Sequence, residues 1–231
     1  MSKTRILIVD DELSIIKFLR ANLESKGYEV LIAMNGAEAL KVFEMELPDL
    51  MLLDITMPKM DGFEVCRRLR EWSQVPIIML SARGDESDKV KCLDLGADDY
   101  ITKPFGKDEL IARVKAVIRR TEMSTTMPTQ PSLTSGDLQI DFASRQVTIA
   151  GKEVKLTPTE YNLLQELVLN TGKVLTHIYL LNKVWGPEYR EEREYLHVFV
   201  RRLRVKLEPD PKNPRYIVTM PAIGYQFKDT A

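Results

Sequence analysis

The sequence predicts two domains of different class, a doubly wound α/β domain with a parallel sheet and a smaller α+β domain after it. In residues 1–120, short apolar runs of strand length alternate with segments of helical period. Strict alternation of this kind is typical of a parallel sheet covered by helices on both faces. Residues 136–231 instead begin with short alternating strands, continue with three helices and end in a hairpin-like stretch.

The elements of the first domain follow from this alternation. Strands are expected at 5–9, 29–33, 50–54, 76–80 and 99–102. Helices are expected at 13–26, 36–46, 61–72, 86–95 and 107–120. The strand runs are apolar along their length, which indicates burial on both faces of the sheet.

The second domain is predicted from turn and cap residues. Strands are expected at 138–142 and 145–151. A helix then begins after Thr157, with Pro158 at its first position and Glu160 three residues after the cap, and it ends at Gly172. Two further helices are expected at 176–185 and 191–208, and the hairpin-like stretch is YIVTMPAIGYQF.

A segment without periodicity separates the two domains. Residues 121–135, TEMSTTMPTQPSLTS, combine Ser, Thr, Pro and Gln with a single charge. This composition is typical of a flexible linker. The predicted organisation is therefore a first domain at 1–120, a linker at 121–135 and a second domain at 136–231.

Composition restricts the class of protein. The chain has 231 residues, 44% of them hydrophobic, and a net charge of −1, as expected for a globular protein of two domains. No run approaches about 18 uninterrupted apolar residues, and the N-terminus lacks the apolar region of a signal peptide. We therefore expect a soluble, cytoplasmic protein without membrane association. Cys66 and Cys92 have no partnering Cys or His spacing and are expected to be ordinary thiols.

Four of the predicted strands end in reactive polar residues. The first ends in Asp10 and Asp11, the third in Asp54, the fourth in Ser81, and Lys103 follows the fifth. Ligands bind beyond the carboxyl ends of the strands in open α/β sheets, so these side chains should converge. Any one of them alone would more often be a cap or a solvated loop residue. Agreement at four strand ends favours a single acidic pocket instead.

This set of side chains suits phosphoryl chemistry. Three carboxylates supply the oxygen ligands that Mg²⁺ prefers. A carboxylate can also be a nucleophile that forms an acyl phosphate, with the metal, a lysine and a hydroxyl neutralising the phosphoryl oxygens. Asp54 is the best candidate for the nucleophile, because Asp10 and Asp11 suffice for the metal.

The motifs IVDDE, LLDITMPKMDGFE, MLSAR and DDYITKPF resemble the response-regulator receiver domain, over residues 1 to about 120. The resemblance implies a flavodoxin-like sheet of order 2-1-3-4-5. It implies that Asp54 accepts a phosphoryl group from a partner sensor histidine kinase. It also implies that Asp11 and the backbone carbonyl of Thr56 bind Mg²⁺ with Asp54, and that Asp10 reaches the metal through water.

The resemblance assigns roles to further residues. Ser81 and Tyr100 match the pair of switch residues, and Lys103 matches the lysine that contacts the phosphoryl oxygens. The Lys103-Pro104 bond matches one that is cis in the family. Thr56 and Arg83 match positions that tune the lifetime of the phosphorylated state.

The helix at 191–208 carries the basic character of the second domain. It contains four basic residues between 201 and 206 beside an apolar stripe. An isolated run of this kind is more often a solvated helix face. Its place at the end of a three-helix unit, before a hairpin, favours nucleic-acid binding instead.

TPTEYNLL, GKVLTHIYLLNKVWG, the RRLRVKLE helix and GYQF resemble the winged helix-turn-helix domain of the OmpR/PhoB family, over residues 136 to about 228. Within that family, KVWGPEY and LEPDPKNPRYI are most similar to the Kdp-type regulators of potassium uptake. The resemblance implies that the helix at 191–208 enters the major groove of double-stranded promoter DNA. The residues assigned to DNA are His197, Val198 and Arg201 on the groove side, Arg202 and Arg204 at phosphates, and Thr219.

The hairpin tip departs from the family in two places. Ala222 stands where a glycine is usual, and alanine tolerates a positive φ poorly. Gln226 replaces a frequent arginine, which should weaken the contact of the tip with DNA.

The receiver resemblance also implies a dimer. Phosphorylation would favour a two-fold receiver dimer through the face built from residues 86–120, and the linker would let two DNA-binding domains occupy direct repeats. RNA polymerase is a further candidate partner. The expected intermolecular ion pairs are Lys89 with Glu109, Asp99 with Arg113, and Asp98 with Arg120.

Two alternatives remain open from the sequence. An aspartyl-phosphate hydrolase also uses a nucleophilic Asp, Mg²⁺ and Lys, but it needs an acidic residue where this chain has Thr56. No turnover of an external substrate is therefore expected. A DNA-binding regulator with a vestigial receiver is the second alternative, and the intact acidic set with Lys103 argues against it.

Overall fold

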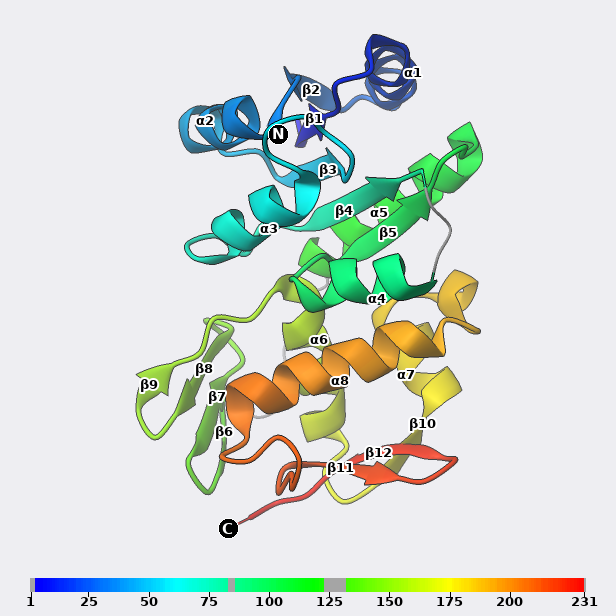
Figure 1. The fold of residues 1–231 in the computed structure, drawn as a ribbon. Coiled ribbons are helices and arrows are strands. Elements are labelled where there is room, and N and C mark those ends of the chain that lie inside the picture. Colours follow the sequence, from blue (N-terminus) through cyan, green and yellow to red (C-terminus); the bar gives the residue numbers. More distant parts are fainter. Residues whose placement is uncertain (1–2, 83–85, 123–131, 231) are drawn as a thin grey trace. The chain divides into compact units, whose positions relative to one another are not determined.

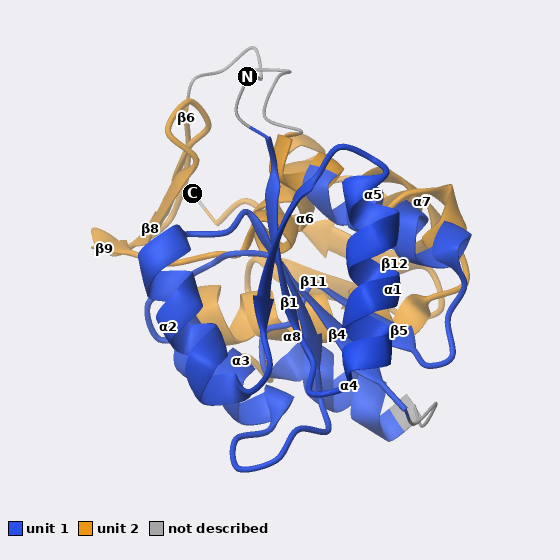
Figure 2. Ribbon diagram, turned by 90° about the horizontal axis from the view of Figure 1, so that it is seen from above, with its two compact units in different colours: residues 1–118 blue, residues 119–231 orange. Residues whose placement is uncertain are grey.

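The computed structural model describes residues 3–82, 86–122 and 132–230, and divides into two compact units, residues 1–118 and 119–231 (Figures 1 and 2). Arg83 and residues 123–131 of the predicted linker lie outside the described residues. At its two ends, the predicted linker is regular structure, because Thr121 and Glu122 complete a helix and Ser132–Ser135 form a strand.

The first unit is a five-stranded parallel sheet of order β2-β1-β3-β4-β5, which confirms the predicted fold class. Its elements alternate as expected (Figure 1). The strands are β1 (Arg5–Val9), β2 (Glu29–Ala33), β3 (Leu50–Asp54), β4 (Ile77–Ser81) and β5 (Asp99–Thr102). The helices are α1 (Leu13–Glu24), α2 (Gly36–Glu46), α3 (Gly62–Arg70), α4 (Glu86–Asp94) and α5 (Lys107–Glu122).

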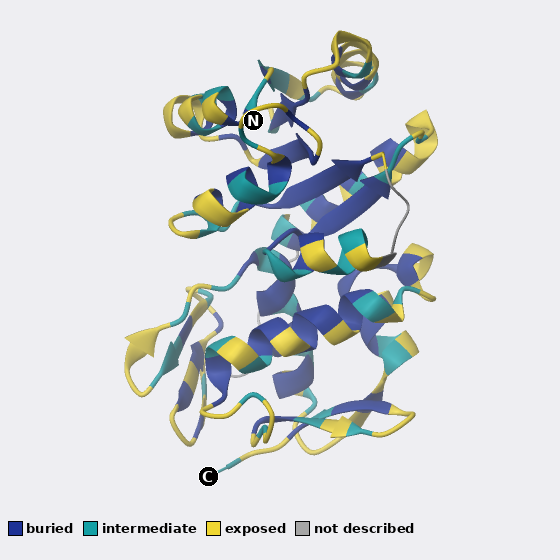
Figure 3. Cartoon of the chain, viewed as in Figure 1, coloured by how far each residue is buried: buried dark blue, intermediate teal, exposed yellow. Residues whose placement is uncertain are grey.

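Two apolar layers hold the helices on opposite faces of the sheet. Leu7 and Val9 of β1 pack in one layer with side chains of α2, α3 and α4, among them Phe43 and Val65. Successive residues of a strand point to opposite faces, and Ile8 accordingly packs in the other layer, with α1 and α5. The central strands β3 and β4 are buried throughout (Figure 3). Burial on both faces explains why their sequences are continuously apolar.

The second unit surrounds a three-helix core with two antiparallel sheets. The first sheet has the order β6-β7-β8-β9 and the second β10-β12-β11. The strands are β6 (Ser132–Ser135), β7 (Leu138–Asp141), β8 (Gln146–Ile149), β9 (Lys152–Glu153), β10 (Val174–Thr176), β11 (Ile217–Met220) and β12 (Gly224–Phe227). The helices are α6 (Pro158–Leu169), α7 (His177–Val184), the short 3-10 helix η1 (Pro187–Tyr189) and α8 (Arg193–Leu207).

The capping box at Thr157 starts α6 as the sequence predicted. The Thr157 side chain accepts a hydrogen bond from the Glu160 amide, and the Glu160 carboxylate accepts one from the Thr157 amide. The helix ends at Leu169, earlier than the predicted stop at Gly172, because Asn170 and Thr171 form a turn whose amides bond to Leu167 and Val168. Four elements that the sequence pattern did not reveal are β6, β9, β10 and η1.

The hairpin between β11 and β12 has Ala222 at φ 63°, in the left-handed region that costs a residue with a Cβ about 1 kcal/mol. We expect Ala222→Gly to stabilise the second unit by about 0.5 kcal/mol, because glycine adopts this φ freely but loses more chain entropy on folding. Chemical denaturation of both proteins measures the difference. The matched control is Ala112→Gly on the exposed side of α5, where glycine should instead cost about 1 kcal/mol. Equal destabilisation by both changes would contradict the strain at Ala222.

Candidate functional site

The carboxyl ends of four neighbouring strands form an acidic pocket in the first unit. Asp10 follows β1, while Asp54 and Ser81 are the last residues of β3 and β4. Strand β1 pairs with β3, and β3 pairs with β4, which brings these ends to one edge of the sheet. All three side chains are buried, with Asp10 0% and Asp54 3% exposed.

Lys103 joins the two buried carboxylates. Its Nζ donates to Asp10 Oδ2 at 2.7 Å and to Asp54 Oδ1 at 2.6 Å. Although burial alone would lower the pKa of Lys103, these hydrogen bonds raise it. Lys103 is therefore held as a cation between two acids, where it can also neutralise oxygens of an anion bound to either.

The pKa of the Asp54 carboxyl is raised from its ordinary value. Burial raises its pKa, the charge of Asp10 raises it further, and Lys103 and the Thr56 amide counteract the rise. The Thr56 amide donates to Asp54 Oδ2 at 2.7 Å. A Cβ at Gly62 would lie 2.2 Å from the Asp54 carbonyl oxygen, so only glycine allows α3 to begin this close to the end of β3. This packing fixes the position of the Asp54 backbone.

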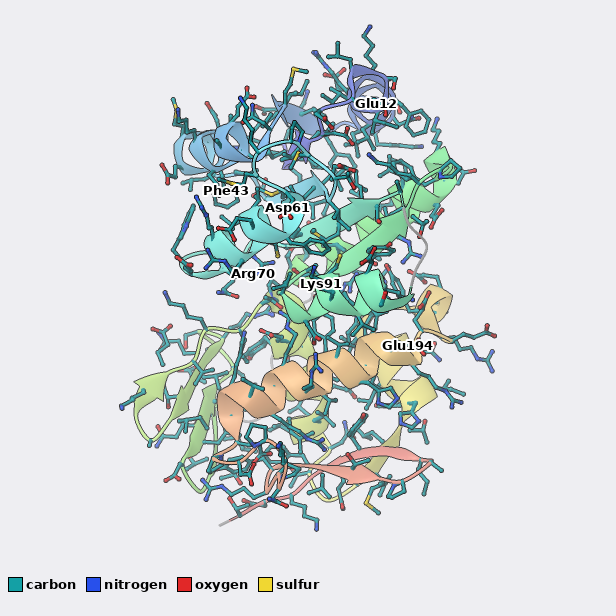
Figure 4. The ribbon with its side chains drawn as sticks, viewed as in Figure 1. Glu12, Phe43, Asp61, Arg70, Lys91 and Glu194 are labelled. Atoms are coloured by element: carbon teal, nitrogen blue, oxygen red, sulfur yellow. The ribbon has the colours of Figure 1, made fainter. Side chains whose placement is uncertain are left out.

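The donor set is suited to a hard cation. Asp10 Oδ1 accepts from the Glu12 amide at 2.9 Å, and Glu12, labelled in Figure 4, begins the first turn of α1. The neighbouring Asp11 side chain is exposed. Within residues 3–82, 86–122 and 132–230, no group of three or more His, Cys, Asp or Glu side chains is already arranged around a point. Mg²⁺ commonly takes one or two carboxylates and keeps several waters, so the residues present fit this ion.

The two predicted switch residues contact each other. Tyr100 is buried, and its hydroxyl makes a side-chain hydrogen bond with Ser81. Burial raises the pKa of Tyr100, and the hydrogen bond with Ser81 partly counteracts that rise. The Lys103-Pro104 peptide bond in the next loop is cis.

The predicted dimer residues are engaged within the chain. Asp98 is fully buried and accepts from Arg70, labelled in Figure 4, at 3.1 Å. Arg113 donates to the buried Asp99 at 3.1 Å and to Glu109 at 3.3 Å. Arg120 is also fully buried, whereas Lys89 is half-buried. Intermolecular pairing of Asp98, Asp99 and Arg113 would therefore require an exchange of partners.

Helix α8 presents only part of its predicted DNA-binding set. His197 and Arg201 are exposed, and Figure 3 shows buried and exposed residues alternating along the helix. Arg204 is half-buried and donates to Thr219 Oγ1 at 2.8 Å and to the Ile217 carbonyl at 2.7 Å. Helix and hairpin are thus joined through Arg204 and the exposed Thr219.

Two of the predicted DNA contacts face the core instead. Val198 is 5% exposed and Arg202 is 8% exposed. They lie one turn apart, on the side of the helix that also buries Tyr195 and Phe199. Arg202 Nε lies 2.8 Å from Glu160 Oε1. The assignments of Val198 to the groove and Arg202 to a phosphate are therefore corrected, because both side chains are largely buried on the core side of the helix.

Two contributors to the site went unnoticed in the sequence. Glu160, identified only as a cap residue, also pairs with Arg202 and with Lys206, whose Nζ is 2.6 Å away. The Tyr225 hydroxyl is hydrogen-bonded to His197 Nδ1 at 2.8 Å. Neither contact could be predicted from the neighbouring sequence, because the partners are far apart in the chain.

A receiver-type parallel sheet with this acidic pocket, followed by a winged helix, defines a response regulator with a DNA-binding effector domain. Residues 6–115 match the response regulator receiver domain, and residues 151–227 match the C-terminal domain of transcriptional regulatory proteins. The chain belongs to the response regulators of the OmpR/PhoB type, a family of transcription regulators rather than of classical enzymes.

Its relatives include transcriptional regulators named KdpE. The protein of Escherichia coli K12 is 47% identical over 97% of this chain and 99% of its own length, and that of Mycobacterium tuberculosis H37Rv is 44% identical with the same coverage. Among solved structures, the Thermotoga maritima OmpR/PhoB homologue DrrB is 32% identical, with a TM-score of 0.53 over 98% of this chain and all of its own. A mutant of RitR is 29% identical, with a TM-score of 0.80 over 99% of this chain and 100% of its own. Across the described residues, no helix is both long and apolar enough to cross a membrane.

Proposed function

We propose that Asp54 accepts a phosphoryl group from a sensor histidine kinase in the cytoplasm, and that this modification controls DNA binding by α8. The observation that carries the proposal is Lys103, which contacts both Asp10 and Asp54 and lies where it could neutralise phosphoryl oxygens. An Asp54 carboxylate oxygen would form the new bond to phosphorus as the bond to the kinase imidazole nitrogen breaks. Thr56 cannot act as the acid or base that rapid hydrolysis needs, so the acyl phosphate would persist.

Mg²⁺ is the proposed cofactor of this transfer. Asp11, Asp54 and the backbone carbonyl of Thr56 would hold it, with Asp10 reaching it through water. The ion would neutralise charge on the phosphoryl oxygens. It would also offset the repulsion between the Asp10 and Asp54 carboxylates, which adds to the larger effect of burial in raising the pKa of Asp54.

The test follows the mass and oligomeric state of the full chain with acetyl phosphate and Mg²⁺. We expect one added phosphoryl group, a shift toward dimer in light scattering, and tighter DNA binding. All three should fail when a chelator removes Mg²⁺. Modification without Mg²⁺, or modification without any change in DNA affinity, would contradict the proposal, and the second result would indicate a vestigial receiver.

The kinase would dock beside Lys103. A pocket of about 270 Å³ is lined there by Ser14, Ile15, Phe18, Lys103, Pro104 and Phe105. Leu13 and Phe18 of α1 are 56% and 37% exposed, and the Phe18 and Phe105 rings lie 6.1 Å apart. Exposed apolar side chains at the mouth of a reactive pocket are suited to seat a partner protein.

Phe18→Ala should slow phosphoryl transfer from the kinase by about ten-fold or more, because it removes a central apolar contact of the docking surface. Transfer from acetyl phosphate should not change, since Phe18 does not contact Asp54. Radiolabel transfer from each donor measures both rates. Met45→Ala, which removes an 80% exposed side chain on α2, is the control. An equal loss with both donors would assign Phe18 to the pocket itself, and no loss with the kinase would place docking elsewhere.

The output would be regulation of direct-repeat promoter sites by a receiver dimer formed through residues 86–120. His197, Arg201, Arg204 and Thr219 supply the proposed DNA face, and RNA polymerase is a candidate partner of the bound protein. Genes for potassium uptake are the proposed targets. Support comes from the Kdp-type motifs and from the Escherichia coli relative, which is named a regulatory protein of the KDP operon.

A further inference from the structure

The only two histidines of the chain lie against each other at the proposed DNA face. His177 is the first residue of α7 and His197 lies on α8, and their ring centroids are 5.6 Å apart. The ring of Tyr225, from β12, is 5.7 Å from that of His177 and 6.3 Å from that of His197. Three separate elements therefore bring every imidazole of the protein to one place.

The surroundings of this histidine cluster, defined as His177, His197 and Tyr225, are cationic. Burial lowers the pKa of His177, and the charges of His197 and Arg193 lower it further. The guanidinium of Arg204 lies 5.8 Å from the centre of the Tyr225 ring. A proton added to the His177 imidazole therefore meets positive neighbours from α8, and a nearby anion would offset that repulsion.

The hydrogen bond between His197 and Tyr225 controls which nitrogen faces outward. When the Tyr225 hydroxyl donates to His197 Nδ1, the proton of the neutral imidazole resides on Nε2. Protonation places a hydrogen on both nitrogens, so Nδ1 becomes the donor and the hydroxyl of Tyr225 must turn away. The ring thereby acquires a charge while staying attached to the hairpin.

We propose that the histidine cluster is a proton-responsive part of the DNA interface, in which Tyr225 positions His197 and protonation of the pair strengthens contact with the phosphate backbone. This inference rests on the proposed DNA face. DNA carries a dense negative charge that would stabilise the protonated pair, so binding would take up protons. Affinity would accordingly rise as pH falls through the range in which histidine titrates.

The experiment measures affinity and salt dependence for the full chain without phosphodonor, between about pH 5.5 and about pH 8. The probe is a duplex selected from a random-sequence pool with the wild-type protein. At about 0.15 M salt we expect affinity to rise about five-fold for each additional phosphate that the protein binds at low pH, with a salt slope steeper by about 1. The double variant His177→Gln/His197→Gln should show a flat profile. Tyr225→Phe should shift the midpoint of the profile, because it removes only the hydroxyl that holds Nδ1.

The variants separate this inference from the proposed function. If Arg201→Ala leaves affinity unchanged, the DNA face itself is wrong and the inference fails with it. If Arg201→Ala weakens binding while the double variant keeps the wild-type pH profile, the histidine inference alone is overturned. Because Asp54 is intact in every variant, titration in the first unit contributes equally to all profiles. Should the double variant not fold, an unshifted midpoint in Tyr225→Phe would overturn the inference.

Discussion

Replacing Asp54 with asparagine is expected to abolish phosphorylation by acetyl phosphate and every change that depends on it. The asparagine side chain keeps the size of aspartate but has no anionic oxygen to attack phosphorus. Lys103 would retain Asp10 as a partner, so the pocket would stay assembled. Intact mass after incubation with acetyl phosphate and Mg²⁺ is the measurement. The control is Asp108→Asn, an exposed acid in the first turn of α5, which should be modified like the wild type.

The same variant should not be less stable than the wild type at neutral pH. Folding raises the pKa of Asp54 from 3.8, chiefly by burial, so the charged form is disfavoured in the folded state. A carboxyl of this kind favours folding below its unfolded pKa and loses that contribution as pH rises through the folded pKa. Asp54→Asn should therefore melt at a higher temperature at neutral pH, with the difference shrinking below about pH 4. Retained phosphorylation in this stable variant would show that Asp54 is not the acceptor.

The acidic pocket could be predicted because topology alone assembles it. Each of its residues stands at the end of an apolar run, and a parallel sheet places all such ends along one edge. The individual hydrogen bonds could not be predicted in the same way. That Lys103 bridges Asp10 and Asp54 depends on side-chain geometry across β1, β3 and the loop after β5, which are separated by tens of residues.

At the proposed dimer face, the charge pattern of the sequence does not show which acidic residues are exposed. Asp98 and Asp99 look like surface acids in the sequence, yet both are fully buried. Asp98 accepts from Arg70 and from the Ile77 amide, and Asp99 accepts from Arg113. These partners come from α3, β4 and α5, so only the folded chain shows that the acids already have partners.

The second unit was predicted less completely, since its strands are short and carry few apolar residues. Strand β6 lies in a Ser/Thr-rich segment whose composition resembles a linker, and its regularity comes from pairing with β7. Helix α8 was found correctly, but a count of basic residues does not show which of them face the core. The orientation of these basic residues depends on Tyr195 and Phe199, which turn one side of α8 toward the core, and on the buried Glu160 of α6.

Substitution of the adjacent residues Arg201 and Arg202 of α8 should therefore have different effects, one on DNA binding and the other on stability. Arg202→Ala is expected to destabilise the second unit by about 3 kcal/mol, because it removes a buried partner of Glu160, which is 0% exposed. It also removes the guanidinium that lies 4.6 Å from the centre of the Phe199 ring. Arg201→Ala, on the exposed side, should leave stability nearly unchanged and weaken specific DNA binding by about 1 to 3 kcal/mol.

Thermal unfolding and DNA titration of both variants separate the two roles. A loss of about 3 kcal/mol corresponds to a melting temperature lower by roughly 10 °C for a unit of this size.

The contribution of the buried pair also depends on pH. Although burial alone would raise the pKa of Glu160, the charges of Arg202 and Lys206 lower it. Their pairing therefore favours folding above pH 4.5, and this contribution is lost in acid. The stability difference between Arg202→Ala and wild type should accordingly shrink as pH falls. If Arg202→Ala instead melted like the wild type and lost only DNA affinity, Arg202 would contact phosphate after all, and the buried pair with Glu160 would not describe the protein in solution.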